Sequence, residues 1–251
     1  MLRQGRREDR GSAVFLMQYV AVSGGADSVA MALLMHERGE EFELLFSDSG
    51  AELPEVFWLI PRLAGYLGKT LNVTAGSTFF EYLIMHDYSL PTQSSRWCTR
   101  VLKSVPQDAW LAKAGNAENV CIGIRADEPR RLKHWPTQGW EIRHPLNEVG
   151  MGKLDVLALC EKHGMLNPVY QWRTNTSCFC CPFQRASDWR GLLRHHPTLF
   201  KVAEEWEEQS VARGRQTWRE RQRLIEIRQA RDDQVSMFDD PDDEPCLICS
   251  L

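Results

Sequence analysis

The sequence AVSGGADSVA, residues 21–30, decides the fold that we expect for this chain. An apolar segment at residues 17–23, MQYVAVS, predicts a buried strand that runs into the adjacent glycines Gly24 and Gly25. A helical pattern, SVAMALLMHERG, follows at residues 28–39. Two glycines permit a tight turn and let the backbone approach a ligand closely. The N-terminus of the next helix directs unpaired N–H groups and the positive end of its dipole toward that turn, so this segment predicts an anion-binding site.

Strand and helix patterns continue to alternate after this turn. Residues 42–48, 70–75 and 119–125 are apolar segments of strand length. Residues 54–67 have a helical pattern that we expect to bend at Pro61. Strands that are apolar almost throughout and alternate with helices are typical of a parallel sheet covered on both faces. We therefore predict an α/β fold whose ligand site lies beyond the carboxyl ends of the strands.

Patterning divides the 251 residues into four predicted parts. These are a basic N-terminal arm at residues 1–13, the α/β domain at residues 14–185, a continuous helical extension at residues 186–231 and an acidic tail at residues 232–251. Hydrophobic residues make up 43% of the chain and charged residues 25%, which is ordinary for a soluble enzyme.

The N-terminal sequence and the cysteine content help to predict the cellular compartment of the protein. The apolar run near the N-terminus is interrupted by Gln18 and leads into the glycine turn, which argues against a secretory signal. No segment reaches the roughly 20 apolar residues that span a bilayer. We expect a cytoplasmic protein without a membrane partner, in which the eight cysteines serve metal binding, catalysis or core packing rather than disulfides.

The polar residues of the glycine turn are the first candidate site residues. Ser23 and Ser28 supply hydroxyl donors on either side of Gly24 and Gly25. Asp27 is expected either to cap the helix or to help hold a divalent cation beside phosphates. No Gly-Lys-Ser/Thr follows the glycines and no Gly-x-Gly-x-x-Gly is present, so neither common nucleotide fingerprint applies. The alternative is an ordinary turn with a capped helix.

Other candidates lie at the predicted carboxyl ends of the later strands. Asp48 and Ser49 follow the second strand and are expected either to reach a ribose or base or to close a turn. Arg125 ends the fourth strand, where its guanidinium fork suits phosphate or sulfate oxygens; the alternative is a surface ion pair. Lys103 is expected to be either an anion contact or an ordinary surface lysine.

Several motifs resemble sequence segments of one known family and occur in the same order as in that family. SGGADS at residues 23–28 resembles the pyrophosphate-binding loop of the PP-loop ATP pyrophosphatases, which have the Rossmann-like adenine nucleotide α-hydrolase fold. FSDSGAELPE (46–55), RWCTRVLK (96–103) and GIRADEPRR (123–131) resemble segments of the phosphoadenosine phosphosulfate (PAPS) reductase family within that superfamily. HPLNEV, NPVYQW and SCFCCPF follow in the order of that family.

The resemblance implies roles for the candidate residues. It implies an adenine nucleotide, ATP with Mg²⁺ or a sulfonucleotide, bound by Asp48, Ser49, Gly123 and Arg125 together with the turn residues 23–28. The catalytic residues that it implies are Ser23, Asp27, Lys103 and Arg125.

Four cysteines form a second candidate site. Cys178 and Cys181 form a Cys-x-x-Cys pair, a spacing that suits either zinc or an iron–sulfur cluster. The resemblance implies a 4Fe–4S cluster held by this pair and by Cys98. Trp97 stands where cluster-binding reductases usually have a second upstream cysteine, so Cys180, a tail cysteine or no protein group is expected to complete the set. Zinc and redox-active thiols remain the alternatives.

The remaining cysteines have different expected roles. Cys121 lies in a predicted strand and Cys160 in a predicted helix, so both are expected to be core residues. Cys246 and Cys249 lie in the acidic tail, either as a redox pair or as part of an incidental end.

Arginines are concentrated at residues 211–231. Such a segment is expected either to bind a nucleic-acid backbone or phosphorylated substrate, or to be a solvated helix face balanced by acidic residues.

Three functional hypotheses follow from these features. The first is an ATP pyrophosphatase that adenylates a substrate for sulfur transfer, resembling the DNA-phosphorothioation ATP pyrophosphatases, with a cysteine desulfurase or a thioredoxin-like reductant as partner. The second is a thiol-dependent reductase of adenosine phosphosulfate (APS) or PAPS that produces sulfite. The third is a non-catalytic nucleotide-binding subunit of a nucleic-acid-modifying or defence complex.

Overall fold

The computed structural model describes residues 16–133, 140–219 and 222–230. The predicted basic arm, the acidic tail and the tail cysteines Cys246 and Cys249 lie outside the described residues. Among the described residues, no helix combines the length and the apolar character needed to cross a membrane.

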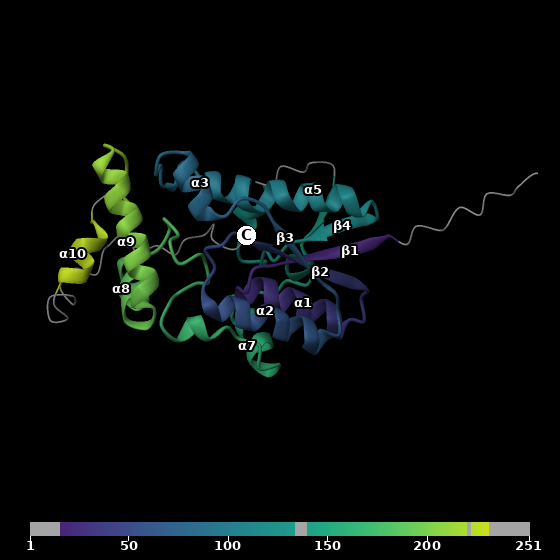
Figure 1. The fold of residues 1–251 in the computed structure, drawn as a ribbon. Coiled ribbons are helices and arrows are strands. Elements are labelled where there is room, and N and C mark those ends of the chain that lie inside the picture. Colours follow the sequence, from purple (N-terminus) through teal and green to yellow (C-terminus); the bar gives the residue numbers. More distant parts are fainter. Residues whose placement is uncertain (1–15, 134–139, 220–221, 231–251) are drawn as a thin grey trace, which may run out of the picture.

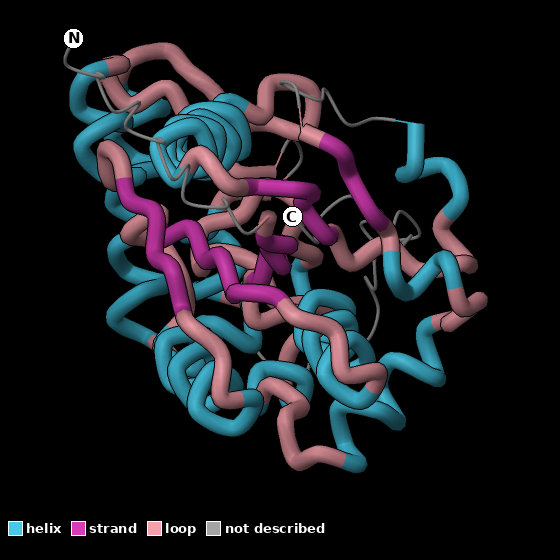
Figure 2. The backbone as a smooth tube through the Cα atoms, turned by 90° about the vertical axis from the view of Figure 1, so that its right-hand side faces the viewer, coloured by secondary structure: helices cyan, strands magenta, loops and turns pink. Residues whose placement is uncertain are grey.

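A five-stranded parallel sheet forms the centre of the fold (Figures 1 and 2), which confirms the predicted α/β class. The strand order is β3-β2-β1-β4-β5. The bounds are Met17–Val22 for β1, Phe42–Asp48 for β2, Leu71–Ala75 for β3, Ala117–Cys121 for β4 and Glu141–Arg143 for β5. Because β1 lies at the centre of this order, the glycine turn that follows it opens in the middle of the carboxyl edge.

Helices cover both faces of the sheet (Figure 1). One face carries α1 (Ala26–Glu37), α2 (Pro54–Leu67) and α7 (Lys153–Lys162). The other face carries α5 (Val105–Ala114), which continues from α4 (Trp97–Thr99) and the π-helix η1 (Arg100–Ser104). Shorter elements are α3 (Phe79–Met85), η2 (Pro129–Lys133), α6 (Pro145–Glu148) and η3 (Pro168–Gln171).

The core lies on both sides of the sheet. Leu44 and Phe46 of β2 point to the larger cluster with α1 and α2, whereas Leu45 packs with Tyr19 and Leu111 in a smaller cluster under α5. Successive strand residues point to opposite faces, so burial of both faces requires strands that are apolar almost throughout. This is the pattern that the sequence shows.

Two expected elements differ from the structure. The fourth strand ends at Cys121 rather than at residue 125, because the chain leaves the sheet and Gly123 passes directly against the backbone of α1. A Cβ atom on Gly123 would lie 2.9 Å from the carbonyl carbon and oxygen of Asp27. The close approach therefore explains both the glycine and the early end of the strand.

The prediction of one continuous helix at residues 186–231 was wrong. The extension contains α8 (Ala186–His195), α9 (Pro197–Ala212) and α10 (Leu224–Gln229). His196 precedes a proline, which disfavours helical backbone, and it has φ −137° and ψ 64°. Gly214, with φ +69°, follows the end of α9.

Aromatic residues join this extension to the rest of the core. Trp206 of α9 stacks on Phe79 of α3, with ring centroids 5.5 Å apart and planes at 10°. Trp218 packs near both Phe79 and Trp189. The extension therefore supports a residue, Phe79, that lines one of the two pockets described next.

Candidate functional site

The glycine turn is held in place by side chains from a distant segment. The side-chain amide of Asn167 donates to the Gly24 carbonyl at 3.0 Å, and the backbone N–H of Ala26 donates to the Tyr170 hydroxyl at 2.9 Å. Gly24 has φ +78°, a conformation that glycine adopts without strain. A Cβ atom on Gly25 would lie 2.8 Å from Thr176 Oγ1. Both glycines are therefore required by the local geometry.

Ser23 and Ser28 face each other across this turn. Their hydroxyl oxygens are 3.3 Å apart, and Ser28 Oγ also accepts from the backbone N–H of Ser23 at 3.1 Å. Ser28 in turn donates to the Gly25 carbonyl at 3.0 Å. The structure thus brings together the turn hydroxyls that the sequence predicted as ligand donors.

Two pockets meet at Ser23, and we call the first the nucleotide-side pocket after the ligand expected from the sequence. It is lined by Ala21, Val22, Ser23, Ser28, Ser47, Thr99, Lys103, Ser104, Gln107, Ile122 and Gly123. Its lining comes from the carboxyl ends of β1, β2 and β4, from the first turn of α1 and from the continuous α4–η1–α5 segment. Hydroxyl, amide and ammonium donors therefore converge on a pocket whose walls are otherwise apolar, as in ligand sites of parallel sheets.

Asp27 and Arg125 form an ion pair instead of facing this pocket. Arg125 Nη1 lies 2.9 and 2.8 Å from the two carboxylate oxygens of Asp27. Arg125 also contacts Asp127 at 2.9 Å and Glu128 at 3.2 Å. Burial alone would lower the pKa of Arg125, but the charges and hydrogen bonds of Asp27, Glu128 and Asp127 together outweigh it and raise the pKa. A cation or anion arriving here would compete with these contacts, and neither residue belongs to the lining of the two described pockets.

The two residues that end β2 have different surroundings. Asp48 Oδ1 accepts from the backbone N–H of Gly50 at 2.8 Å, so Asp48 closes the turn after the strand. Ser49 is 1% exposed and its hydroxyl donates to Glu52 Oε1 at 2.9 Å. Only Ser49 of this pair lines a described pocket.

That pocket contains three of the predicted cysteines, and we call it the thiol pocket. Its lining comprises Ser23, Ser49, Glu52, Phe79, Arg96, Cys98, Thr99, Leu102, Lys103, Thr176, Ser177, Cys178, Cys181, Pro182 and Phe183. Cys180 is fully buried and does not belong to this lining. The described cysteines form no disulfide.

The thiol pocket has the donor set expected for a soft metal group, but not a single-ion site. Within residues 16–133, 140–219 and 222–230, no three or more His, Cys, Asp or Glu side chains are grouped so as to hold one metal ion. In a 4Fe–4S cluster each cysteine binds a different iron, so its ligands stand farther apart than those of one zinc ion. Cys98, Cys178 and Cys181 line one pocket, and cysteine thiolates are the usual ligands of such clusters.

Burial favours the protonated form of these thiols in the metal-free chain. It raises the pKa of Cys98, Cys178 and Cys180. Neighbouring Cys181 raises the pKa of Cys98 further, and the Glu52 carboxylate does the same for Cys178. Lys103 acts in the opposite direction on both Cys98 and Cys178.

The segment that carries the cysteine pair is fixed from behind by Arg173, which is 3% exposed. Its Nη2 atom donates to Ser177 Oγ at 2.6 Å and to the Cys178 carbonyl at 3.2 Å. The backbone N–H of Phe179 donates to the Ala51 carbonyl at 3.0 Å. These contacts place the Cys-x-x-Cys pair beside the loop that follows β2.

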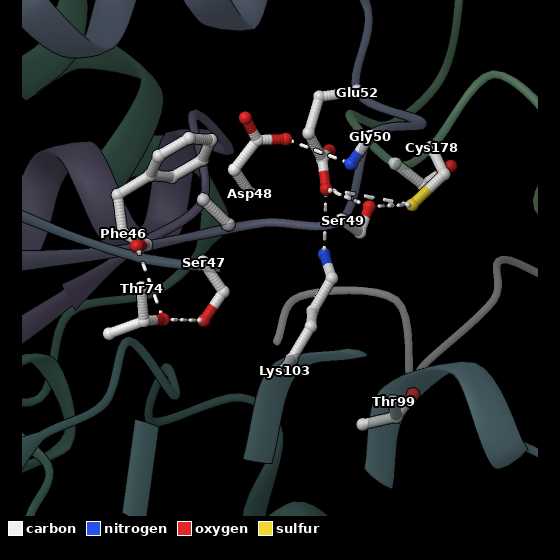
Figure 3. Close-up of polar contacts among 12 residues, drawn as sticks. Phe46, Ser47, Asp48, Ser49, Gly50, Glu52, Thr74, Thr99, Lys103 and Cys178 are labelled. Carbon is white, nitrogen blue, oxygen red and sulfur yellow. Dashed lines mark hydrogen bonds and ion pairs between the residues drawn. The ribbon is translucent and has the colours of Figure 1, made fainter. Parts of the chain in front are cut away.

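The nucleotide-side pocket and the thiol pocket share a wall made of Ser23, Thr99 and Lys103. Glu52 holds Lys103 there (Figure 3), with Lys103 Nζ 3.2 Å from Glu52 Oε1. The sequence placed Glu52 at the carboxyl edge of the sheet but predicted no role for it in the site. The available signal was its place in FSDSGAELPE, an acidic residue between the second strand and the next helix.

Two other sets of predicted residues have clear positions. Cys121 and Cys160 are fully buried core residues, as predicted, and burial raises the pKa of each to about 12.

In the arginine-rich segment, Arg213 and Arg215 pair with Asp87, and Arg228 pairs with Glu204. These three arginines therefore contact two carboxylates of the same chain, and the acidic run expected to balance them lies outside the described residues.

Comparisons with known proteins agree with the geometry. Residues 18–175 match the family model described as the phosphoadenosine phosphosulfate reductase domain. An uncharacterized protein of Methanocaldococcus jannaschii is 25% identical over 197 residues, which cover 75% of this chain and 40% of the relative. An uncharacterized nin region protein of Escherichia phage lambda is 30% identical over 173 residues, 57% of this chain and 58% of the relative.

One solved structure with some similarity is that of PAPS reductase from Candida auris in a phosphate complex. Its TM-score is 0.49 and its sequence identity 17%, with 62% of this chain and 78% of that chain covered. The chain spans less than half the length of the two M. jannaschii relatives that it matches, 40% of one and 22% of the other.

Proposed function

Because the chain belongs to the phosphoadenosine phosphosulfate reductase family of nucleotide-binding PP-loop proteins, we propose that it is an ATP pyrophosphatase that adenylates a substrate for sulfur transfer. The observation that carries the proposal is the wall of Ser23, Thr99 and Lys103, which separates a polar nucleotide-side pocket from a thiol pocket. Adjacent pockets would let adenylation and sulfur transfer act on one bound substrate.

The turn at residues 23–28 would bind the β- and γ-phosphates of ATP. Backbone N–H groups at the start of α1 and the hydroxyls of Ser23 and Ser28 are suited to anions. This turn keeps both the second glycine, Gly25, and the final serine, Ser28, which favours a pyrophosphate ligand over a sulfonucleotide without one. Mg²⁺ would enter bound to the ATP phosphates.

The proposed reaction has two displacements. A nucleophilic atom of the acceptor substrate attacks the α-phosphorus, the bond to the β-phosphate oxygen breaks, and pyrophosphate leaves with the electron pair. The terminal sulfur of a persulfide donor, such as a cysteine desulfurase, then attacks the activated substrate and displaces AMP. A second thiol, from the donor or from a thioredoxin-like reductant, attacks the donor's cysteine sulfur, so that the S–S bond breaks and the terminal sulfur stays on the substrate with the electron pair. Lys103 lies on the wall between the pockets, where its charge would stabilise the oxygens of the transferred group.

The thiol pocket would supply the sulfur-handling part of the site. Cys98, Cys178 and Cys181 would hold a 4Fe–4S cluster, and an iron without a protein ligand would bind sulfide for transfer. Cys180 would need to leave its fully buried position to act as the fourth ligand.

A second candidate is a thiol-dependent APS or PAPS reductase. The observation that favours it is the Cys178 sulfur, 3.7 Å from Glu52 and close to Lys103, on the same pocket as Ser23. A sulfonucleotide with its sulfate against this wall would meet a thiol directly.

Product identification separates these functions. Anaerobically purified protein is incubated with ATP and Mg²⁺, and separately with APS and PAPS plus a thioredoxin-type reductant. Pyrophosphate release from ATP supports the first function, and sulfite release supports the second. Nucleotide binding without either product would contradict both and favour a non-catalytic subunit.

A further inference from the structure

One oxygen atom, Glu52 Oε1, is the meeting point of three donors in Figure 3. Ser49 Oγ lies 2.9 Å from it, Lys103 Nζ 3.2 Å and Cys178 Sγ 3.7 Å. These residues come from the loop after β2, from η1 and from the Cys-x-x-Cys segment. Glu52 therefore ties together three segments that build the thiol pocket.

The Glu52 carboxylate is well shielded from water, since its side chain is 3% exposed, whereas that of Lys103 is 20% exposed. Burial alone would lower the pKa of Lys103, but the surrounding acidic groups, led by the charge of Glu52 and its hydrogen bond, together outweigh burial and raise the pKa. A long lysine side chain has several rotamers of similar energy, so it takes a fixed position only where partners hold it. Glu52 provides that partner.

Lys103 lines both pockets, but Glu52 lines only the thiol pocket. The ion pair therefore holds the ammonium group from the side of the thiol pocket, while Lys103 also lines the nucleotide-side pocket. A negative charge at Glu52 also opposes the binding of an anion to the same lysine, because like charges repel. The pair thus limits how tightly Lys103 binds the nucleotide while it fixes where Lys103 stands.

We propose that Glu52 is the positioning residue that couples the two pockets, holding Lys103 on their shared wall next to Cys178. This inference rests on the proposed function for the reaction that it assists, and Glu52 acts through Lys103 rather than on the substrate. It assigns Glu52 an effect on turnover that is separate from nucleotide affinity.

A double-mutant cycle with Glu52→Gln, Lys103→Met and the combined variant tests the coupling. Each single variant is expected to lower kcat by about tenfold or more, and the combined variant by no more than the larger single loss, because both changes remove the same positioned ammonium group. Glu52→Gln is expected to bind the nucleotide as tightly as the wild type or more tightly, whereas Lys103→Met binds it more weakly. Losses that multiply in the combined variant would overturn the proposal.

The split between affinity and turnover distinguishes positioning from a structural role. A variant that merely loosened the site would lose nucleotide affinity together with kcat, and that result would also overturn the proposal. Glu204→Gln is the matched control, because Glu204 is a buried carboxylate paired with Arg228 and lies outside both pocket linings. It is expected to keep the wild-type kcat and affinity.

A binding experiment tests the coupling if the wild type turns over none of the substrates and the proposed function fails. The rate at which iodoacetamide alkylates Cys178 in metal-free protein is measured with and without an α,β-methylene analogue of ATP. The analogue is expected to change this rate in the wild type and to leave it unchanged in Glu52→Gln, with the analogue bound in both. An equal change in both proteins, or no change in the wild type, would overturn the inference.

Discussion

Arg125 binds both carboxylate oxygens of Asp27 with its Nη1 atom, at 2.9 and 2.8 Å. Asp27 belongs to the first turn of α1, and Arg125 follows the short buried segment after β4. The contact therefore joins two neighbouring strand ends behind the glycine turn. This position makes Arg125 a support for the turn that we propose binds phosphates.

Replacement of Arg125 by methionine tests that support. Arg125→Met would leave the Asp27 carboxylate, which is 7% exposed, without its main counter-charge. Loss of one partner of a buried pair typically costs about 3 kcal/mol of unfolding free energy or more, and we expect a loss of this size in urea unfolding at neutral pH. ATP binding should weaken as well.

The exposed Arg100→Met variant is the control for Arg125→Met, since Arg100 is an exposed arginine in the described part of the chain. It should change the unfolding free energy by less than about 0.5 kcal/mol. Equal stability of Arg125→Met and the wild type would show that the Asp27 pair does not support the fold.

The sheet could be predicted from the sequence because strands that are buried on both faces are apolar almost throughout. Residues 42–48 were predicted as a strand and β2 has the same bounds, since each of its faces is buried under a different set of helices. The turn hydroxyls Ser23 and Ser28 were predicted for a similar reason, because they are neighbours in one local motif.

Pairings between distant residues could not be predicted in this way. Asp27 and Arg125 are 98 positions apart, and either side chain alone suits a role at an anion site. Glu52 and Cys178 are 126 positions apart, and nothing in either segment indicates the other. The continuous helix at residues 186–231 was wrong because polar and charged residues fit a helix well, while His196 before Pro197 interrupts it.

Gly123→Ala tests the close approach of the chain to α1. The added Cβ atom would lie 2.9 Å from the carbonyl carbon and oxygen of Asp27 and 3.0 Å from the Ser28 nitrogen, which are backbone atoms that cannot turn aside. We expect a loss of about 1–3 kcal/mol in unfolding free energy and weaker nucleotide binding, measured by urea unfolding and calorimetry.

Gly65→Ala provides the matched comparison for Gly123→Ala. Gly65 lies inside α2, and a Cβ atom there would meet nothing within 4 Å. Alanine favours a helix interior over glycine by roughly 0.5–1 kcal/mol, so this variant should be as stable as the wild type or more stable. Similar losses in both variants would contradict the close approach.

The buried thiol of Cys121 predicts how stability changes in alkali. Burial raises the pKa of Cys121 from the ordinary 9.0 to about 12, so the folded protein keeps this proton where the unfolded chain loses it. The contribution of this thiol to the unfolding free energy is fully present below pH 9.0 and is lost as the pH rises to about 12. The unfolding free energy should fall by up to about 1.4 kcal/mol per pH unit from this group.

Urea unfolding of the wild type and Cys121→Ala, at about pH 8 and about pH 10.5, measures this contribution. Other groups titrate in the same range, but they are common to both proteins. The wild type should therefore lose more stability than the variant between the two pH values. An equal loss of unfolding free energy in the wild type and in Cys121→Ala would show that the Cys121 thiol does not keep its proton.

Single cysteine variants test the proposed cluster site. Cys178→Ala and Cys181→Ala remove thiols that line the thiol pocket, and each should strongly reduce the brown colour and the iron and sulfide content of anaerobically purified protein. Cys160→Ala is the control, because Cys160 is fully buried in α7 and belongs to neither pocket lining. It should keep the full iron content. Purified protein that contains zinc with no iron would contradict the cluster, and Cys178→Ala that retains all of its iron would contradict the ligand assignment.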